Sequence, residues 1–349
     1  MRIAQVAPLY ESVPPRLYGG TERVVHYLTE ELVRQGHDVT LYASGDSQTS
    51  ARLRAVCKRA LRLEGGNNVC PQAPHVLQCE LVAQEGEQYD VVHNHADFLL
   101  FPQIRHGGFP AITTLHGRLD TPELFPLFRE FDDMRLISIS NAQRAPMRWA
   151  SWMATVHHGL PEELYIPQER PGAYLAFLGR VSPEKGLGAA IEIARKAGRK
   201  LRVAAKVDAA DREYFEHEIK HLLDQPHVEF LGEIGEHQKS EFLGNALALL
   251  FPIEWPEPFG LVMIKAMACG TPVIAYRRGS VTEILDDGVT GFIVDDADAA
   301  ATAVQHVEEL NRRRCREVFQ RRFSARRMCE DYLRVYEQIM DRELQRACA

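Results

Sequence analysis

Residues 251–275 read FPIEWPEPFGLVMIKAMACGTPVIA, and this stretch decides the fold expected for the second half of the chain. The apolar run 247–251 predicts a buried strand, and a proline-rich turn follows it. Residues 259–270 predict a buried helix that ends at Cys269-Gly270, and residues 271–275 predict the next strand. A strand, a helix and a second strand in this order are typical of a parallel α/β sheet.

Glu257 lies at the predicted strand-to-helix junction, directly before the helix that Phe259, Gly260 and Leu261 begin. The first N–H groups of a helix have no partner within it, and the helix dipole favours anions there. A carboxylate beside an anion site suits a ligand that carries hydroxyls for Glu257 and phosphate for the N–H groups. A nucleotide sugar is such a ligand.

Composition limits the classes of protein that the chain can belong to. Its 349 residues suffice for two domains, and 26% charged with 45% apolar residues indicates a soluble globular protein. A net charge of −7 argues against a dedicated nucleic-acid binder, and no apolar run reaches transmembrane length. The seven cysteines are scattered without metal spacing or a disulfide framework, and no cleavable signal begins the chain, so we expect a cytoplasmic protein.

Short apolar runs alternate with amphipathic stretches in two successive series. The first series predicts a helix at 20–36 and strands at 2–7, 38–43, 90–93, 111–115 and 135–139. The pattern thins at 158–174, where prolines cluster, and we interpret this segment as a linker. The second series predicts a helix at 187–198 and strands at 175–178, 201–206, 228–231, 246–251 and 272–275. The predicted fold is therefore α/β, with two facing Rossmann-like domains and an interdomain cleft.

Two loops that follow predicted strands carry features suited to a diphosphate. Gly19 and Gly20 open the first helix, where glycines allow a ligand close to the backbone, although a simple turn explains them equally well. Thr21 is a reasonable N-cap for that helix. Arg180 and Lys185 flank the loop after the first strand of the second domain, and two cations there suit two phosphates better than they suit a plain surface.

Histidines gather after strands of the first domain. His93 and His95 lie in VVHNH and His116 in TTLHG, and no acidic partners with ligand spacing accompany them, so we predict no metal site. His95 and Asp97 are candidates for contact with an acceptor. A structural, hydrogen-bonding role remains an alternative for each histidine.

The last segment, 311–349, is predicted to be helical and is rich in arginine at its start. A solvated helical face is the simpler interpretation. Contact with an anionic acceptor or a membrane surface is the alternative.

Six segments in order resemble family 4 retaining glycosyltransferases of the GT-B fold: GGxE at 19–22, HG at 116–117, GR…KG at 179–186, EPFG at 257–260, MACGTPVIA at 267–275 and GxTGF at 288–292. The resemblance implies an acceptor-side domain at 1–160, a nucleotide-sugar domain at 161–325 and a terminal helix at 326–349 that packs back on the first domain. It also implies that Arg180 and Lys185 clamp the pyrophosphate, while Glu257 and His116 hold the sugar.

Lys265 departs from the family pattern. The family has a second glutamate at this position, which accepts hydrogen bonds from the ribose hydroxyls, whereas a charged lysine has donors and no acceptor. Lys265 could pair with Glu257 across the site, and Lys265→Glu is predicted to raise donor affinity. An altered donor, a weakened enzyme and a changed residue are three explanations that the sequence leaves open.

The sequence therefore predicts a metal-independent, retaining hexosyltransferase without a cofactor. Its expected donor is a UDP-sugar or GDP-sugar bound by Gly19, Gly20, Phe259, Gly260, Leu261 and Lys265 together with Glu257, His116, Arg180 and Lys185. The expected acceptor is a hydroxyl of a sugar, a lipid-linked sugar or a small molecule. We expect no nucleic-acid partner and no transmembrane segment. Peripheral attachment to the inner membrane face is the alternative to a location free in the cytoplasm. A non-catalytic nucleotide-sugar-binding protein and a phosphorylase or epimerase of the same fold are the alternatives.

Overall fold

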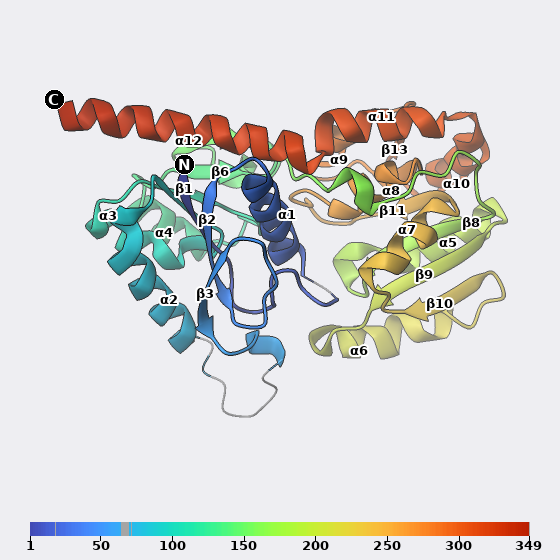
Figure 1. The fold of residues 1–349 in the computed structure, drawn as a ribbon. Helices are drawn as coiled ribbons and strands as arrows, with labels where there is room; N and C mark the ends of the chain where they lie inside the picture. Colours follow the sequence, from blue (N-terminus) through green and yellow to red (C-terminus); the bar gives the residue numbers. More distant parts are fainter. Residues whose placement is uncertain (18, 64–69, 71, 349) are drawn as a thin grey trace. The chain divides into compact units, whose positions relative to one another are not determined.

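The computed structural model describes residues 1–17, 19–63, 70 and 72–348. The chain divides into two compact units, which we call the N-terminal unit, Met1–Gly159 with Ala325–Ala349, and the C-terminal unit, Leu160–Ser324. The chain leaves the N-terminal unit after Gly159 and returns to it at Ala325, so the C-terminal unit is an insertion in it. Figure 1 shows the elements of each unit coloured along the sequence.

The N-terminal unit is built on a parallel sheet that contains seven strands within the described residues, in the order β3-β2-β1-β4-β5-β6-β7. These strands are β1 (Arg2–Val6), β2 (Asp38–Ser44), β3 (Arg52–Cys57), β4 (Val91–Asn94), β5 (Ala111–Thr114), β6 (Leu136–Ser138) and β7 (Trp152–Thr155). Its helices are α1 (Gly20–Arg34), α2 (Gln72–Glu85), α3 (Phe101–Gly107), α4 (Leu124–Glu130) and α12 (Ala325–Cys348).

Side chains of this sheet alternate between two covered faces. Ala4 and Val6 of β1 belong to a core cluster with Cys79 and Val82 of α2. The intervening Gln5 points to the other face, where its amide contacts Tyr336 of α12. Helix α12 packs beside α1 on that face. The near-continuous apolar strands noted in the sequence are therefore explained by helices on both sides of a parallel sheet.

The C-terminal unit repeats this architecture with a parallel sheet of six described strands, in the order β10-β9-β8-β11-β12-β13. The strands are β8 (Tyr174–Arg180), β9 (Lys200–Lys206), β10 (Val228–Gly232), β11 (Ala246–Phe251), β12 (Val273–Tyr276) and β13 (Gly291–Val294). The helices are α5 (Leu187–Ala197), α6 (Arg212–Tyr214), α7 (Glu236–Gly244), α8 (Leu261–Ala268), α9 (Val281–Ile284), α10 (Ala297–His306) and α11 (Arg312–Phe323). Helices α5 and α10 pack together, and α8 packs on α7 and α11.

The predicted fold class, two Rossmann-like α/β domains, is confirmed. The buried helix expected after Gly260 is α8, and the strands expected on either side of it are β11 and β12. Strands β3, β7 and β13 were not predicted. Strand β3 interleaves arginine with apolar residues and has no continuous apolar run, whereas the apolar run 292–294 of β13 could have been recognised.

The arginine-rich start of the terminal segment is partly a solvated face, as expected for Arg313, Arg314 and Arg321, which are exposed, but Arg312 and Arg316 are not part of that face. Arg312 is buried, and its guanidinium donates to the carbonyls of Gln168, Gly244 and Ala246 at 2.7–3.0 Å. Arg316 donates in the same way to the carbonyl of Ala268 at 2.7 Å. These arginines tie α11 to loops of the C-terminal unit, so the sequence-based interpretations were wrong for them. None of the described helices is long and apolar enough to cross a membrane.

Candidate active site

The loop after β8 and the loop after β11 meet at the carboxyl edge of the C-terminal sheet. Gly186 ends the first loop with φ 70°, and a Cβ on it would lie 2.0 Å from the carbonyl oxygen of Pro252. Only glycine permits this backbone approach. The close approach places Lys185 beside Glu257, and their Nζ and Oε2 atoms are 2.5 Å apart.

Glu257 is held by two donors on the same oxygen. Besides Lys185, the indole Nε1 of Trp255 donates to Oε2 at 2.7 Å. The Lys185 ammonium also lies 5.1 Å from the centre of the Trp255 ring, which is cation–π distance. The side chains of Lys185 and Glu257 keep 18% and 12% of their exposure, so both remain accessible to a ligand.

Arg180 occupies the end of β8, on the same loop as Lys185. Its guanidinium lies 2.6 Å from Glu184 and 3.2 Å from Asp211, and 30% of the side chain is exposed. Both predicted phosphate-binding cations therefore have acidic partners within the chain. A diphosphate has to compete with these carboxylates, which is a feature that the sequence did not indicate.

Helix α8 begins at Leu261 without a side-chain cap, after Gly260 in a left-handed conformation with φ 77°. Its first N–H groups are thus available for an anion. The Phe259 ring is buried and meets Phe323 edge-on at 6.3 Å, so its side chain packs the core. Only the main chain of Phe259 remains as a candidate for donor binding.

Lys265 is buried and pairs with Glu236, not with Glu257. Its Nζ lies 2.9 Å from Oε1 of Glu236, the carboxylate at the start of α7. Lys239 approaches the other oxygen at 2.8 Å, and the Tyr165 hydroxyl donates to Oε1. A family-type glutamate at position 265 would place two carboxylates together, so the lysine is matched to its surroundings.

In the N-terminal unit, Gly19 precedes α1 and Gly20 is the first residue of that helix. Gly19 has φ 152°, and a Cβ on it would lie 2.7 Å from the Cβ of Pro15. Position 19 is therefore restricted to glycine by its surroundings. The N-cap position is Gly19, so the proposed N-cap role of Thr21 was wrong.

A buried hydrogen-bond chain links the C-terminal helix to His116. The Gln5 amide donates to the Tyr336 hydroxyl at 3.1 Å and accepts from Nε2 of His95 at 2.8 Å. Nδ1 of His95 then lies 2.9 Å from Nε2 of His116. With His95 protonated on Nε2, its Nδ1 accepts, and His116 donates from Nε2. His116 is thus neutral with an unprotonated Nδ1.

Burial explains the neutral state of these rings. It holds the pKa of His116 down to about 3 and lowers the pKa values of His93, His95 and His158 as well. His158 stacks on His116 with ring centres 5.3 Å apart. His93 is fully buried between Tyr336 and Thr114, at 2.7 Å from each, and its role is structural.

Asp97, the other acceptor-side candidate, follows β4 with a left-handed backbone, φ 52°. Its carbonyl accepts from the Asn94 side chain at 2.6 Å, and the residue is exposed. A left-handed aspartate is uncommon and is often found at functional loops. Its role stays a prediction.

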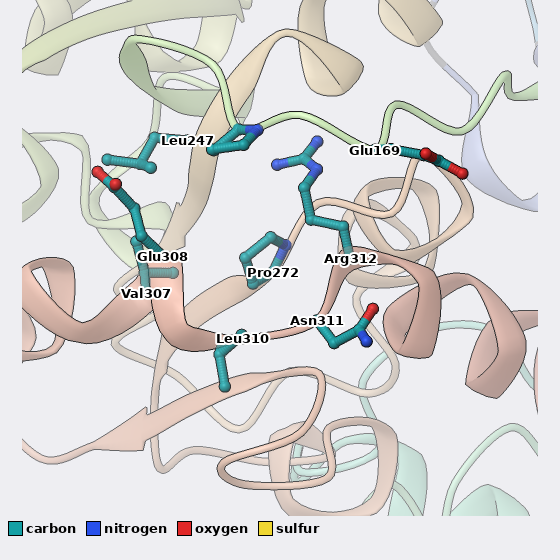
Figure 2. A pocket seen from close by; sticks show the side chains of 9 residues that line it. Glu169, Leu247, Pro272, Val307, Glu308, Leu310, Asn311 and Arg312 are labelled. Atoms are coloured by element: carbon teal, nitrogen blue, oxygen red, sulfur yellow. The ribbon is translucent and has the colours of Figure 1, made fainter.

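A pocket of about 180 Å³ opens elsewhere in the C-terminal unit, as Figure 2 shows. Leu247, at the start of β11, and Pro272, directly before β12, line it together with Arg312. These residues mark the amino-terminal edge of the parallel sheet, whereas Glu257 follows the carboxyl end of β11. The pocket is therefore separate from the candidate active site.

Several residues around the candidates were missed at the level of sequence. Trp255 lies within the quoted stretch, and its indole could have been noted as a donor for Glu257. Glu236, Gln5 and Tyr336 carry no motif and lie far along the chain from their partners, so only the fold identifies them. Among the described residues, no group of three or more histidine, cysteine or acidic side chains is placed to hold a metal ion.

Comparisons with known proteins cover both units. Residues 166–322 match the family Glycosyl transferases group 1, and residues 18–175 match Glycosyltransferase Family 4. The chain is 25% identical to phosphatidyl-myo-inositol mannosyltransferase of Mycobacterium leprae, over 97% of each chain. It is 32% identical to N-acetyl-alpha-D-glucosaminyl L-malate synthase of Bacillus anthracis over 130 residues, which are 35% of this chain and 33% of that protein.

Solved structures share the fold over almost the whole chain. A glycosyltransferase involved in avilamycin A biosynthesis is 24% identical with a TM-score of 0.74, over 97% of this chain and 98% of that one. The Anabaena protein Alr3699/HepE, solved in complex with UDP-glucose, is 19% identical with a TM-score of 0.70, over 97% of this chain and 100% of that one. The two family matches and the shared fold together show that this chain belongs to the GT-B glycosyltransferases of family 4, the glycosyl transferases group 1.

Proposed function

We propose that this glycosyltransferase moves a hexose from a nucleoside-diphosphate sugar to a hydroxyl acceptor with retention of the anomeric configuration. The observation that carries the proposal is the cluster of Lys185, Glu257 and the uncapped start of α8 at one sheet edge. A cation and free helix N–H groups suit phosphate, and a carboxylate suits sugar hydroxyls.

In the proposed reaction, Arg180 and Lys185 bind the diphosphate, and the N–H groups at Gly260 and Leu261 contribute to the same site. The bond between the anomeric carbon and the diphosphate oxygen breaks, and the acceptor oxygen bonds to that carbon on the same face. The acceptor proton passes to the departing diphosphate oxygen. The two cations stabilise the negative charge that develops on the leaving group.

Glu257 and His116 are proposed to hold the sugar, each as a hydrogen-bond acceptor for hydroxyls. The carboxylate of Glu257 accepts in any case, and the neutral His116 has an acceptor in its unprotonated Nδ1. Gly19 and Gly20 are proposed to let the backbone approach the donor. His95 and Asp97 remain candidates for the acceptor side, although His95 also fixes the tautomer of His116.

The donor is proposed to be a UDP-sugar or a GDP-sugar, and UDP-glucose is the first to assay because a protein of this fold was solved with it. The acceptor hydroxyl belongs to a sugar, a lipid-linked sugar or a small molecule. We propose that the reaction takes place in the cytoplasm, and that no metal is needed because two cations and a helix end supply the positive charge.

The test is transfer from a panel of UDP- and GDP-sugars to added acceptors, in buffer with a chelator. The anomeric configuration of the product is read by NMR from its proton coupling. Transfer with retention in chelator supports the proposal. An inverted product, or activity that needs an added divalent ion, contradicts it. Binding of a nucleotide sugar without any turnover would favour the alternative of a weakened enzyme, to which Lys265 points.

A further inference from the structure

We propose that Trp255 is a positioning residue, whose indole N–H holds Glu257 independently of Lys185. Glu257 then stays in place to accept a sugar hydroxyl while the Lys185 ammonium turns to the diphosphate. The identity of the ligand in this inference rests on the proposed function. The anchoring of Glu257 by Trp255 does not.

The geometry gives Glu257 two unlike donors on one oxygen. Nζ of Lys185 at 2.5 Å and Nε1 of Trp255 at 2.7 Å both bond to Oε2. Within the described chain, Oε1 of Glu257 has no hydrogen-bond partner, and it is not buried. Oε1 is therefore the oxygen that can accept from a ligand, and its direction depends on what holds Oε2.

The backbone makes Trp255 the more rigid of the two donors. The N–H of Glu257 donates to the carbonyl of Trp255 at 2.8 Å, and Pro256 between them has a fixed φ. Ser280 N–H adds a bond to the Glu257 carbonyl at 3.0 Å. Residues 255–257 thus form one tight backbone turn that holds both the Trp255 indole and the Glu257 carboxylate.

Lys185 reaches Glu257 from a different loop through a flexible four-carbon chain. Its ammonium has three protons and strong affinity for phosphate oxygens, so a bound diphosphate competes for it directly. If Lys185 were the sole anchor, the carboxylate would lose its orientation at the moment when the sugar arrives. The bond from the Trp255 indole keeps the orientation of Glu257 independent of Lys185, because the local backbone holds the indole N–H and it does not move to the phosphate.

The first experiment needs no ligand. The three tryptophans, Trp149, Trp152 and Trp255, give three indole N–H signals in a ¹H–¹⁵N spectrum, and the signal missing in Trp255→Phe is that of Trp255. A carboxylate partner shifts this proton downfield. The inference expects the downfield signal to persist in Lys185→Ala and on addition of UDP. Loss of the downfield shift in Lys185→Ala overturns it, because Trp255 would then not hold Glu257 by itself.

The second experiment separates positioning from packing. Trp255→Phe keeps an aromatic ring beside Lys185 but removes the N–H donor. We expect it to weaken UDP-glucose binding about tenfold, as loss of a bond to a charged group does. UDP without sugar should bind within about twofold of the wild type. GDP-mannose and GDP serve as the second pair of probes.

Trp152→Phe is the matched control, because it also deletes an indole N–H bond, to the Met147 carbonyl at 2.8 Å, in the other unit. Trp152→Phe should leave the affinities for UDP and for UDP-glucose unchanged. An equal loss for UDP and UDP-glucose in Trp255→Phe would assign Trp255 to packing and overturn the inference. If the wild type bound none of the four nucleotides, the proposed function would fail, and the indole signal would still decide whether Trp255 anchors Glu257.

Discussion

Lys185 and Glu257 are 72 residues apart in the sequence, and their side chains meet at 2.5 Å. The contact joins the residue predicted to bind phosphate to the residue predicted to bind sugar. Each neutralises the other in this contact, so a phosphate bound by Lys185 and a hydroxyl bound by Glu257 would replace it together. A nucleoside-diphosphate sugar supplies both.

The first prediction concerns the phosphate-binding cations. Lys185→Ala should weaken UDP binding about 30-fold, and Arg180→Ala about tenfold because its side chain is more exposed. Isothermal titration calorimetry measures both. Lys196→Ala, which removes a lysine of α5 that pairs with the exposed Asp298 of α10, is the control and should bind UDP normally. Wild-type affinity in both site variants would remove these residues from the donor site.

The second prediction concerns the buried pair of Lys265 and Glu236. Lys265→Glu places a carboxylate beside Glu236 in a buried setting and should destabilise the chain by roughly 2–4 kcal/mol. The exchange Glu236→Lys with Lys265→Glu should restore only part of this loss, since the pair is re-formed with reversed charges but the new lysine then faces Lys239. Urea unfolding of the wild type, the two single variants and the double variant gives the interaction free energy between positions 236 and 265.

Donor affinity is then best measured in the double variant, whose folded state is less compromised than that of Lys265→Glu. Lys220→Glu, at an exposed pair with Glu216, is the control for charge reversal and should cost little. A fully stable Lys265→Glu chain would show that Lys265 and Glu236 are not coupled.

The third prediction concerns pH. The pKa values of His93, His95, His116 and His158 are lowered by burial, so the unfolded chain binds more protons than the folded chain below about pH 6.5. The free energy of unfolding should be at its full value above that pH and should fall on acidification, by about 1.4 kcal/mol for each histidine and each pH unit.

Urea unfolding between pH 5 and 7 measures this slope before most carboxylates titrate. His95→Gln should reduce the slope by about one proton. A stability that does not change across this range would contradict the assignment of neutral, buried histidines.

The fourth prediction compares two adjacent arginines of α11. Arg312 is buried among carbonyl acceptors, whereas Arg313 is exposed and pairs with the exposed Glu169. Arg312→Lys cannot satisfy the same set of acceptors and should cost about 2–4 kcal/mol of unfolding free energy. Arg313→Lys should remain within about 0.5 kcal/mol of the wild type. Equal effects in thermal unfolding would show that the buried bonds of Arg312 contribute nothing.

The sequence predicted the α/β class because buried parallel strands read as apolar runs, as in 246–251 and 201–206. It placed Glu257 before α8 because proline and glycine mark that junction. Half-exposed β3 gave no such signal. It also could not show that Lys185 contacts Glu257, because that contact depends on two loops that only the folded sheet brings together.

Pairings between distant charged groups were equally hidden. Lys265 was considered as a partner of Glu257, eight positions away, because helical spacing makes that contact conceivable. The structure gives it Glu236 from α7, because α8 packs on α7. Likewise, Arg312 and Arg316 of α11 could not be told apart in the sequence from their exposed neighbours, because their carbonyl partners lie far along the chain.

The return of the chain to the N-terminal unit at Ala325 has a consequence for the order of folding during synthesis. The ribosome synthesises the whole C-terminal unit before α12, and within that unit the Leu160 N–H donates to the Phe323 carbonyl at 2.9 Å. The sheet of the N-terminal unit is made first, and the face to which Gln5 points is covered only after Tyr332 and Tyr336 of α12 have been made. The half that is begun first is therefore the half that is finished last, and a truncated translation product leaves Gln5 and His93 without their hydroxyl partner.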